Sequence, residues 1–258
     1  MDDKRYISKE EKKIPIDDPS GKWSDLTLLP EWSEDFYDVY TARKFGKWVM
    51  LKALKKEYAD QPEYRKMLEN EFDIRYNLAH PNIVMVNDFE DVPGVGRAII
   101  TDDVYGYSLR RLIDERRLTP KIVKRLQTQL LNAMEYIAEN HIEHHPITPD
   151  NIVFTEYNEN LKLLNVGYAQ KNRMTSGDEH EDIKSYGRVL NEVLDQLPTS
   201  LPHLRRIAQK CESDKKTYNH IADVQLAMVK RNSGQLLTIV SIFILLMGAL
   251  LMWLTLRS

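Results

Sequence analysis

Several features are scarce in this 258-residue sequence, and each scarcity excludes a class of protein. Cys211 is the only cysteine, so no disulfide can form within the chain, as is typical of a reducing compartment. Basic residues are not in excess, because 36 Lys and Arg stand against 39 Asp and Glu and the net charge is −3. No nucleic-acid partner is therefore expected. The N-terminus, MDDKRYISKEEKK, holds no apolar run, so a secretory signal is not expected either.

Metal-ligand patterns are also scarce. His141, His144 and His145 lie close together in the sequence, but the adjacent pair cannot both face one side of a strand or loop. No cysteine and no clear fourth ligand are nearby. We predict no metal site.

One long uncharged run lies near the C-terminal end. Leu236 to Leu256 spans 21 residues, 13 of them Leu, Ile, Val or Phe. As a helix it would be about 31 Å long, against about 30 Å for the hydrocarbon core of a bilayer. We predict a transmembrane helix at 236–256 that binds the lipid bilayer, with a buried core helix as the alternative. Lys230 and Arg231 before it favour a cytoplasmic N-terminal domain, so the predicted localisation is a single-pass membrane protein.

Small residues recur every seven positions along and beside this run, at Gly234, Ser241, Gly248 and Thr255. Small residues on one stripe let helices approach closely. Self-association through the membrane helix is therefore a hypothesis, with chance alignment as its alternative.

The remaining chain is rich in strand patterns first and in helix patterns second. Residues 1–25 mix charges with prolines and predict a flexible arm, whereas 26–54 alternate apolar and polar residues around RKFG and predict a β-hairpin. A charged amphipathic helix follows at Glu63–Ala79. Helical periodicity dominates from Ser108 to Asn140, interrupted at Thr119-Pro120, where Thr119 is expected to cap a helix that begins with Pro120.

Short strands are expected at Ile152–Phe154 and Leu161–Leu164, before a helical stretch from Asp182 to about Lys230. Within this order, five motifs resemble those of the protein kinase family in sequence and spacing. They are Val49-Met50-Leu51-Lys52 for V-A-I-K, Glu71 for the helix glutamate, His144 to Asn151 for H-R-D-L-x-x-x-N, Asn165-Val166-Gly167 for D-F-G, and Asp182 to Gly187 for D-x-x-S-x-G.

The resemblance implies an α+β fold with two lobes, a strand-rich N-lobe at about 26–103 and a helical C-lobe at about 104–230, followed by the transmembrane helix. It also implies a nucleotide site between the lobes. The residues that match this site are Lys52, Glu71, Asn151 and Thr101, the last at the gatekeeper position before a hinge at 102–104.

The resemblance also indicates which catalytic groups of the family are missing from this sequence. The two catalytic aspartates of the family correspond here to Pro146 and Asn165, and neither side chain can replace a carboxylate as base or magnesium ligand. The three glycines of the phosphate loop correspond to Trp32, Glu34 and Tyr37, which should block or repel a triphosphate. Two further departures fill or charge the site: Met50 replaces a small alanine of the adenine pocket, and Arg75 replaces an apolar residue beside D-F-G.

We therefore predict no catalytic residues, no metal, no required cofactor and at most weak ATP binding at a vestigial site. The predicted function is a membrane-anchored pseudokinase that acts as a cytoplasmic scaffold or regulator for a protein partner, which the sequence does not identify. The helix Glu63–Arg75 and the arm are candidate contact regions, although a charged run is more often a solvated face. The alternative is a divergent ATP-binding transferase that keeps Lys52 and Glu71 and recruits Asp150 or Asp102.

Overall fold

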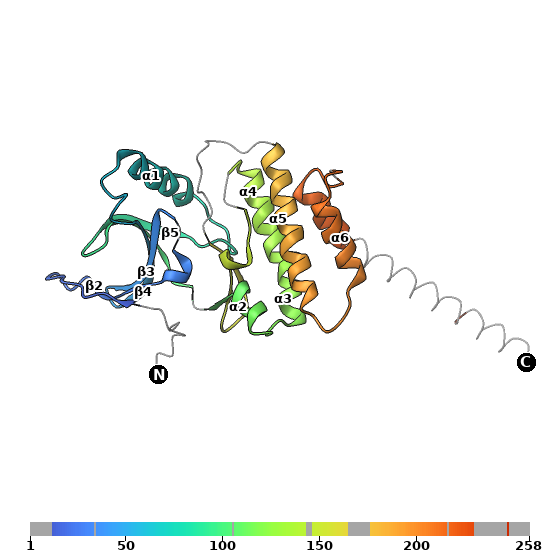
Figure 1. Cartoon of the computed structure of the whole chain (residues 1–258), viewed down its shortest axis with the longest axis horizontal. Coiled ribbons are helices and arrows are strands. Elements are labelled where there is room, and N and C mark those ends of the chain that lie inside the picture. The colour runs from blue at the N-terminus through green and yellow to red at the C-terminus, as the bar shows by residue number, and fades with distance from the viewer. Residues whose placement is uncertain are drawn as a thin grey trace, which may run out of the picture.

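The computed structural model describes residues 12–33, 35–104, 106–142, 146–164, 176–215 and 217–229, together with Met247. A strand-rich lobe comes first and a helical lobe second, and the two lie side by side in Figure 1. This order agrees with the two-lobed fold predicted from the sequence. We refer to the two parts as the N-lobe and the C-lobe.

The N-lobe contains β1 (Lys12–Lys13), β2 (Trp23–Leu28), the 3-10 turn η1 (Pro30–Trp32), β3 (Tyr37–Lys44), β4 (Lys47–Leu54), α1 (Pro62–Tyr76), β5 (Val86–Val92) and β6 (Gly96–Asp102). The C-lobe contains β7 (Gly106–Ser108), α2 (Leu109–Asp114), α3 (Pro120–Arg125), the π-helical turn η2 (Leu126–Leu130), α4 (Leu131–Glu139), the 3-10 turn η3 (Pro149–Asn151), β8 (Ile152–Thr155), β9 (Leu161–Leu163), α5 (Ser176–Asp195) and α6 (Pro202–Glu212). Residues 221–229 are also helical.

The N-lobe sheet has the strand order β1-β2-β3-β4-β6-β5, and all its neighbouring strands are antiparallel. Phe45 and Gly46 form the turn between β3 and β4 with φ angles of 50° and 79°. Two positive φ angles suit the tight turn whose twist matches that of the strands, and glycine adopts them without strain. The hairpin predicted within residues 26–54 is confirmed.

Strand β4 directs alternate side chains to the two faces of the N-lobe sheet. Val49 and Leu51 pack into a cluster on one face of the sheet. Met50 and Lys52 alternate with them and line a cavity on the other face. Because successive side chains of a strand point to opposite faces, this alternation brings Lys52 beneath the sheet.

Strand pairing begins earlier than the hairpin prediction indicated. Lys12 and Lys13 pair with β2, and Trp23 is buried at 5% exposure although it lies within the residues predicted as an arm. The alternation was hidden because charged residues and two prolines surround these short strands. Residues 1–11 of the predicted arm lie outside the described residues.

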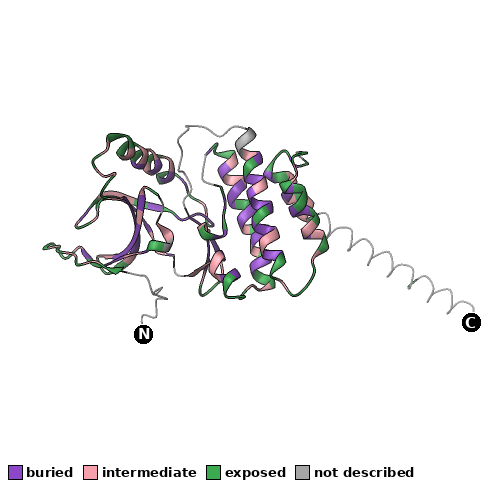
Figure 2. Ribbon diagram, viewed as in Figure 1, coloured by how far each residue is buried: buried purple, intermediate pink, exposed green. Residues whose placement is uncertain are grey.

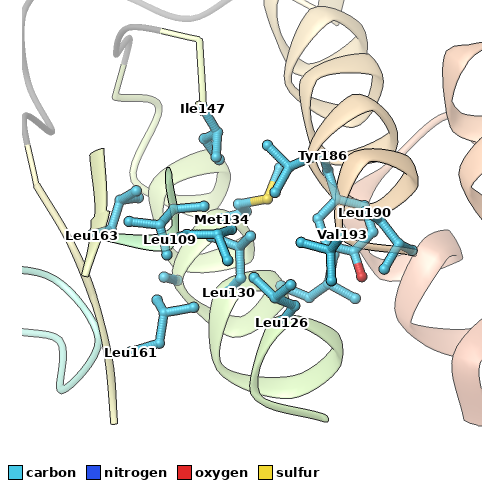
Figure 3. Packing of buried hydrophobic residues seen from close by; sticks show 14 of the residues in the cluster. Leu109, Leu126, Leu130, Met134, Ile147, Leu161, Leu163, Tyr186, Leu190 and Val193 are labelled. Carbon is cyan, nitrogen blue, oxygen red and sulfur yellow. The ribbon is translucent and has the colours of Figure 1, made fainter. Parts of the chain in front are cut away.

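The C-lobe is organised around the packing of α5 against the helical run from α3 to α4. Leu126, Leu130 and Met134 recur at helical spacing and meet side chains of α5, among them Tyr186 and Leu190 (Figure 3). Buried side chains line the facing sides of the two helices, and α5 is also largely buried where α6 covers it (Figure 2). A helix that packs on two neighbours needs a wide apolar face, which α5 has.

Helix boundaries follow local sequence signals. The hydroxyl of Thr119 accepts a hydrogen bond from the Ile122 N–H at 3.3 Å, and Pro120 occupies the first turn of α3, as predicted. Gly187 allows α5 to approach α6 closely, since a Cβ atom at this position would lie 2.7 Å from Cys211 Cβ and 2.8 Å from the Ala208 carbonyl oxygen.

The predicted localisation as a single-pass membrane protein is corrected by the structure. In the described part of the chain, no helix combines the length and the apolar character needed to cross a membrane. The longest, α5, has 20 residues, but charged side chains such as Asp182 and Lys184 recur along it, and burying them in hydrocarbon is costly. The segment Leu236–Leu256 itself lies outside the described residues except for Met247, as do Gly234 and Lys230.

Candidate functional site

A cavity of about 470 Å³ lies between the two lobes. Its N-lobe wall comes from the turn around Trp32 and from the cavity-facing residues of β3, β4 and β6. Its C-lobe wall comes from the segment around η3 and from the residue after β9. The lining residues are Trp32, Ser33, Asp35, Phe36, Val39, Met50, Leu51, Lys52, Arg75, Val84, Thr101, Pro146, Thr148, Asp150, Asn151 and Leu164.

A buried group of three charges closes the N-lobe end of this cavity. Lys52 Nζ lies 3.2 Å from Glu71 Oε2, and Arg75 Nη1 donates a hydrogen bond to Glu71 Oε1 at 2.7 Å. All three side chains are almost fully buried, at 6%, 1% and 5% exposure. The ring of Tyr37 lies 4.4 Å from Lys52 Nζ and adds a cation–π contact.

The protonation of Glu71 follows from this arrangement. Burial by itself would raise its pKa, but the charges of Lys52 and Arg75 and their hydrogen bonds hold the pKa below its ordinary value of 4.5. Glu71 is therefore a carboxylate at neutral pH. It contacts both cations.

Trp32 lies in the apolar part of the cavity wall and packs against two hydrophobic clusters. It packs against a sheet cluster of Leu29, Val39 and Met50, and also against a second cluster. The members of that second cluster are Val84, Val104, Val153 and Leu164. One indole ring thus packs against a cluster of the sheet and against a cluster that includes the C-lobe residues Val153 and Leu164.

Ser33 fixes the turn that carries Trp32. Its hydroxyl accepts a hydrogen bond from the Val39 N–H at 3.0 Å and donates one to the Leu29 carbonyl at 3.1 Å. The Leu29 N–H also donates to the Val39 carbonyl at 2.8 Å. These bonds close the loop at its base, which holds the indole toward the cavity.

The other two residues at the loop-glycine positions behave differently. Tyr37 is fully buried with the apolar residues that face α1 and does not line the cavity. Glu34 lies outside the described residues.

The C-lobe wall is held by the side chain of Asn151. Its Oδ1 accepts from the Thr148 N–H at 3.0 Å, and its Nδ2 donates to the Pro146 carbonyl at 3.3 Å. The Asn151 carbonyl accepts from the Leu164 N–H at 2.8 Å. In this arrangement the amide of Asn151 stabilises the loop that presents Pro146 to the cavity.

The structure brings most of the predicted site residues together. Lys52, Thr101, Asn151 and Pro146 line the cavity, and Glu71 lies directly behind Lys52. Asn165 lies outside the described residues.

The two acids named as alternatives are engaged elsewhere. Asp150 lines the cavity but is exposed and lies 3.6 Å from the Arg110 guanidinium. Asp102 does not line it and accepts hydrogen bonds from Lys47 and Asn87. Among the residues that the structure describes, no cluster of three His, Cys, Asp or Glu side chains is placed to hold a metal ion. His144 and His145 are not among them.

Two features of the site were missed at the sequence level. The Arg75–Glu71 pair has i,i+4 spacing on α1 and could have been found from that spacing. The packing of Trp32 against the cluster that includes Val153 and Leu164 could not, because it depends on how distant segments meet.

Comparisons with known proteins agree with this architecture. Residues 35–199 match the sequence model of a family described as the protein kinase domain, which covers more than half of the chain. Serine/threonine-protein kinase ULK3 of Homo sapiens is 30% identical over 146 residues, which are 55% of this chain and 30% of that protein.

Further relatives give the same picture. The ULK3 kinase of Xenopus laevis is 29% identical over 151 residues, covering 57% of this chain and 31% of the relative. Serine/threonine-protein kinase 36 of Pongo abelii is 32% identical over 152 residues, covering 58% of this chain and 11% of the relative. The matched region thus spans less than a third of each of these relatives.

Proposed function

Because this chain belongs to the protein kinase family, we propose that it is a member without phosphoryl-transfer activity, which acts as a scaffold or regulator by binding another protein. A fold of this kind hosts many functions, so the proposal has to come from the site.

The observation that carries the proposal is the residue at the position of the catalytic base. Pro146 is exposed and lines the cavity where the family uses a carboxylate to accept the proton of the substrate hydroxyl. A proline side chain has no group that can accept a proton. Loss of such a base reduces the rate by about 10²–10⁴.

Asp35 lines the cavity from the loop after Trp32, on the N-lobe side, whereas the base position at Pro146 is on the C-lobe side. Three other described carboxylates in or near the cavity are poor substitutes. Glu71 is buried between two cations, which lowers its affinity for a proton. Asp150 is exposed beside Arg110, and Asp102 is hydrogen-bonded outside the cavity. A base must lie within hydrogen-bond reach of the hydroxyl that it deprotonates, and none of these positions offers a free carboxylate for that purpose.

The indole of Trp32 supports the same proposal from the side of the nucleotide. It packs against Val39 and Met50 of the sheet and against the cluster that contains Leu164. Because this flat apolar ring already packs against both clusters, less apolar surface of the cavity is left to bind a nucleotide base. ATP is expected to bind weakly.

The outward face of α1 is the surface that we propose for a protein partner. Glu63, Lys66, Glu69 and Asp73 are exposed on it, whereas Leu68 on the opposite side is buried. Mixed charges on one rigid helix favour specific pairing with a partner of complementary charge.

One observation favours the alternative, a divergent ATP-binding transferase. The Lys52–Glu71 ion pair is formed, and in the family this pair orients the lysine that contacts the nucleotide phosphates. The same geometry also serves as a structural tie between β4 and α1.

A label-transfer assay separates the two candidates. The purified chain is incubated with radiolabelled ATP and magnesium, alone and with a generic peptide substrate, and compared with Lys52→Ala. Lys47→Ala is the matched control, because Lys47 lies on the same strand with 73% of its side chain exposed. We expect no label above background in any of the three proteins. Label that disappears in Lys52→Ala and persists in Lys47→Ala would establish the transferase instead.

The binding half of the proposal needs its own test. The tagged natural chain is cross-linked in cells, and the proteins bound to it are identified. The experiment is then repeated with the tagged variant Lys66→Glu, and the amount of each bound protein is compared. We expect the partner to be lost with Lys66→Glu and kept with Lys215→Glu, an exposed lysine on the C-lobe. Equal recovery with both variants would remove α1 as the contact surface.

A further inference from the structure

We propose that the cavity between the lobes binds an organic ammonium ion, a small molecule with a protonated amine and an apolar body. The ammonium group lies beside Asp35, and the apolar body packs against the apolar walls of the cavity. This inference is separate from the proposed protein partner, because it concerns a small molecule and a different surface.

The cavity has the size and the walls of a small-molecule site. Its volume is about 470 Å³ with the indole of Trp32 in place, and small-molecule sites commonly span roughly 300–1,000 Å³. Val39 and Met50 of the sheet line it together with Val84 and Leu164. These side chains favour a ligand that buries apolar surface.

Three polar side chains of the lining already have partners within the protein. The Ser33 hydroxyl and the Asn151 amide hold their own loops, and the Thr101 hydroxyl donates a hydrogen bond to the Asp102 carbonyl at 3.2 Å. A ligand rich in hydrogen-bonding groups would gain little from such side chains, because each new bond would replace an existing one.

The cations of the lining are engaged as well. Lys52 and Arg75 are almost fully buried, at 6% and 5% exposure, and both contact Glu71. The ring of Tyr37 adds a second contact for Lys52 at 4.4 Å. These two cations therefore offer little to a negatively charged ligand.

The exposed charges of the lining are carboxylates. Asp35 lines the cavity from the N-lobe side and Asp150 from the C-lobe side, and both residues are exposed. The guanidinium of Arg110 lies 3.6 Å from Asp150 and offsets part of its charge. Asp35 is therefore the stronger attraction for a cation, and the phosphates of a nucleotide would be repelled there.

The loop that carries Asp35 also supplies aromatic rings. Trp32 and Phe36 line the cavity from the same loop. The face of an aromatic ring attracts an ammonium group, and a nearby carboxylate adds a direct interaction between opposite charges. This combination selects an ammonium ion with an apolar body over a neutral or an anionic molecule.

The test compares three ligands of similar shape and different charge. Phenylbutylamine, phenylbutanol and phenylbutyrate are each titrated into the intact chain at pH 7 in a calorimeter, and ATP with magnesium forms a fourth series. We expect phenylbutylamine to bind about fivefold or more tightly than phenylbutanol, the ratio that one contact between opposite charges supplies in water. Phenylbutyrate should bind more weakly than either.

Variants of single carboxylates locate the ammonium group. Asp35→Asn should lower the affinity for phenylbutylamine to that for phenylbutanol and leave the affinity for phenylbutanol unchanged. Asp150→Asn should have a smaller effect, because Arg110 already offsets its charge. Asp60→Asn is the matched control, since this carboxylate is 97% exposed, contacts Arg65 and does not line the cavity. All three positions are exposed, so the variants are expected to fold.

Several results would overturn the proposal. They are a failure of phenylbutylamine to bind, binding of phenylbutyrate as tight as that of the amine, and a preference for the amine that persists in Asp35→Asn or is lost equally in Asp60→Asn. Tighter binding of ATP with magnesium than of phenylbutylamine would make the cavity a nucleotide site instead. The surface of α1 proposed for a protein partner is tested separately by cross-linking, so the two proposals can fail independently.

Discussion

Replacing Glu71 by glutamine tests the buried charges at the centre of the molecule. The substitution keeps the shape of the side chain and removes its charge. Arg75 and Lys52 would then lose the carboxylate that they share, at 2.7 Å and 3.2 Å. Since the side chains of both cations are almost fully buried, water would solvate them poorly in place of that carboxylate.

The expected magnitude follows from these distances and from burial. At an effective dielectric constant of about 20, unit charges roughly 3 Å apart attract each other by roughly 5 kcal/mol. Desolvation offsets much of this attraction in the intact group, but it is not recovered when only one partner is removed. We expect Glu71→Gln to lower the free energy of unfolding by about 3–5 kcal/mol. At roughly 2–4 °C for each kcal/mol, this corresponds to a melting temperature lower by about 6–20 °C.

The free energy of unfolding, measured by urea denaturation, is compared for the natural chain, Glu71→Gln, Glu69→Gln and the double variant Glu71→Gln/Arg75→Met. Glu69→Gln is the matched control, because Glu69 is exposed on the same helix and its change should alter stability by no more than about 0.5 kcal/mol. The double variant Glu71→Gln/Arg75→Met should be more stable than Glu71→Gln, since one uncompensated cation is removed. If Glu71→Gln loses less than about 1 kcal/mol, the three charges are not coupled as we infer.

Three further outcomes are expected. The pKa of Glu71 is lowered in the folded chain, so its contribution to stability is complete above the unfolded pKa and is lost as the pH falls through the folded pKa. Between pH 6 and pH 3, the urea midpoint of the natural chain should therefore fall more steeply than that of Glu71→Gln. Burial raises the pKa of Cys211 to about 12, so a thiol reagent at pH 8 should modify it only in urea; rapid modification of the folded chain would contradict its burial in the C-lobe. Gly187→Ala should destabilise the chain by about 1–3 kcal/mol in thermal unfolding, because the added methyl group meets α6; an unchanged melting temperature would show that α6 shifts freely.

Local signals in the sequence were sufficient for most of the fold. The φ-positive turn at Phe45-Gly46 and the cap at Thr119-Pro120 each involve residues within a few positions of one another. Such elements depend on backbone sterics and on one or two hydrogen bonds, so their patterns are visible in the chain. The charged partners Lys52 and Glu71 could be paired only through the family resemblance, because 19 positions separate them.

The site was less predictable where distant segments meet. Trp32 was expected to obstruct phosphates, but its packing against the C-lobe cluster requires the turn closed by Ser33 and the exact approach of the two lobes. Apolar character alone was also a poor guide to localisation. Length and hydropathy of the run at 236–256 predicted a membrane protein, and the helices that the structure describes do not support that prediction.

The indole of Trp32 has one more consequence, for motion. Two-lobed enzymes commonly open and close by a hinge motion as a ligand binds and leaves. Here the group between the lobes is a side chain of the protein itself, so opening would separate the indole from the cluster that contains Val39 or from the cluster that contains Leu164. The two lobes are therefore expected to keep one relative orientation, and a partner that recognises this conformation would bind without first having to induce it.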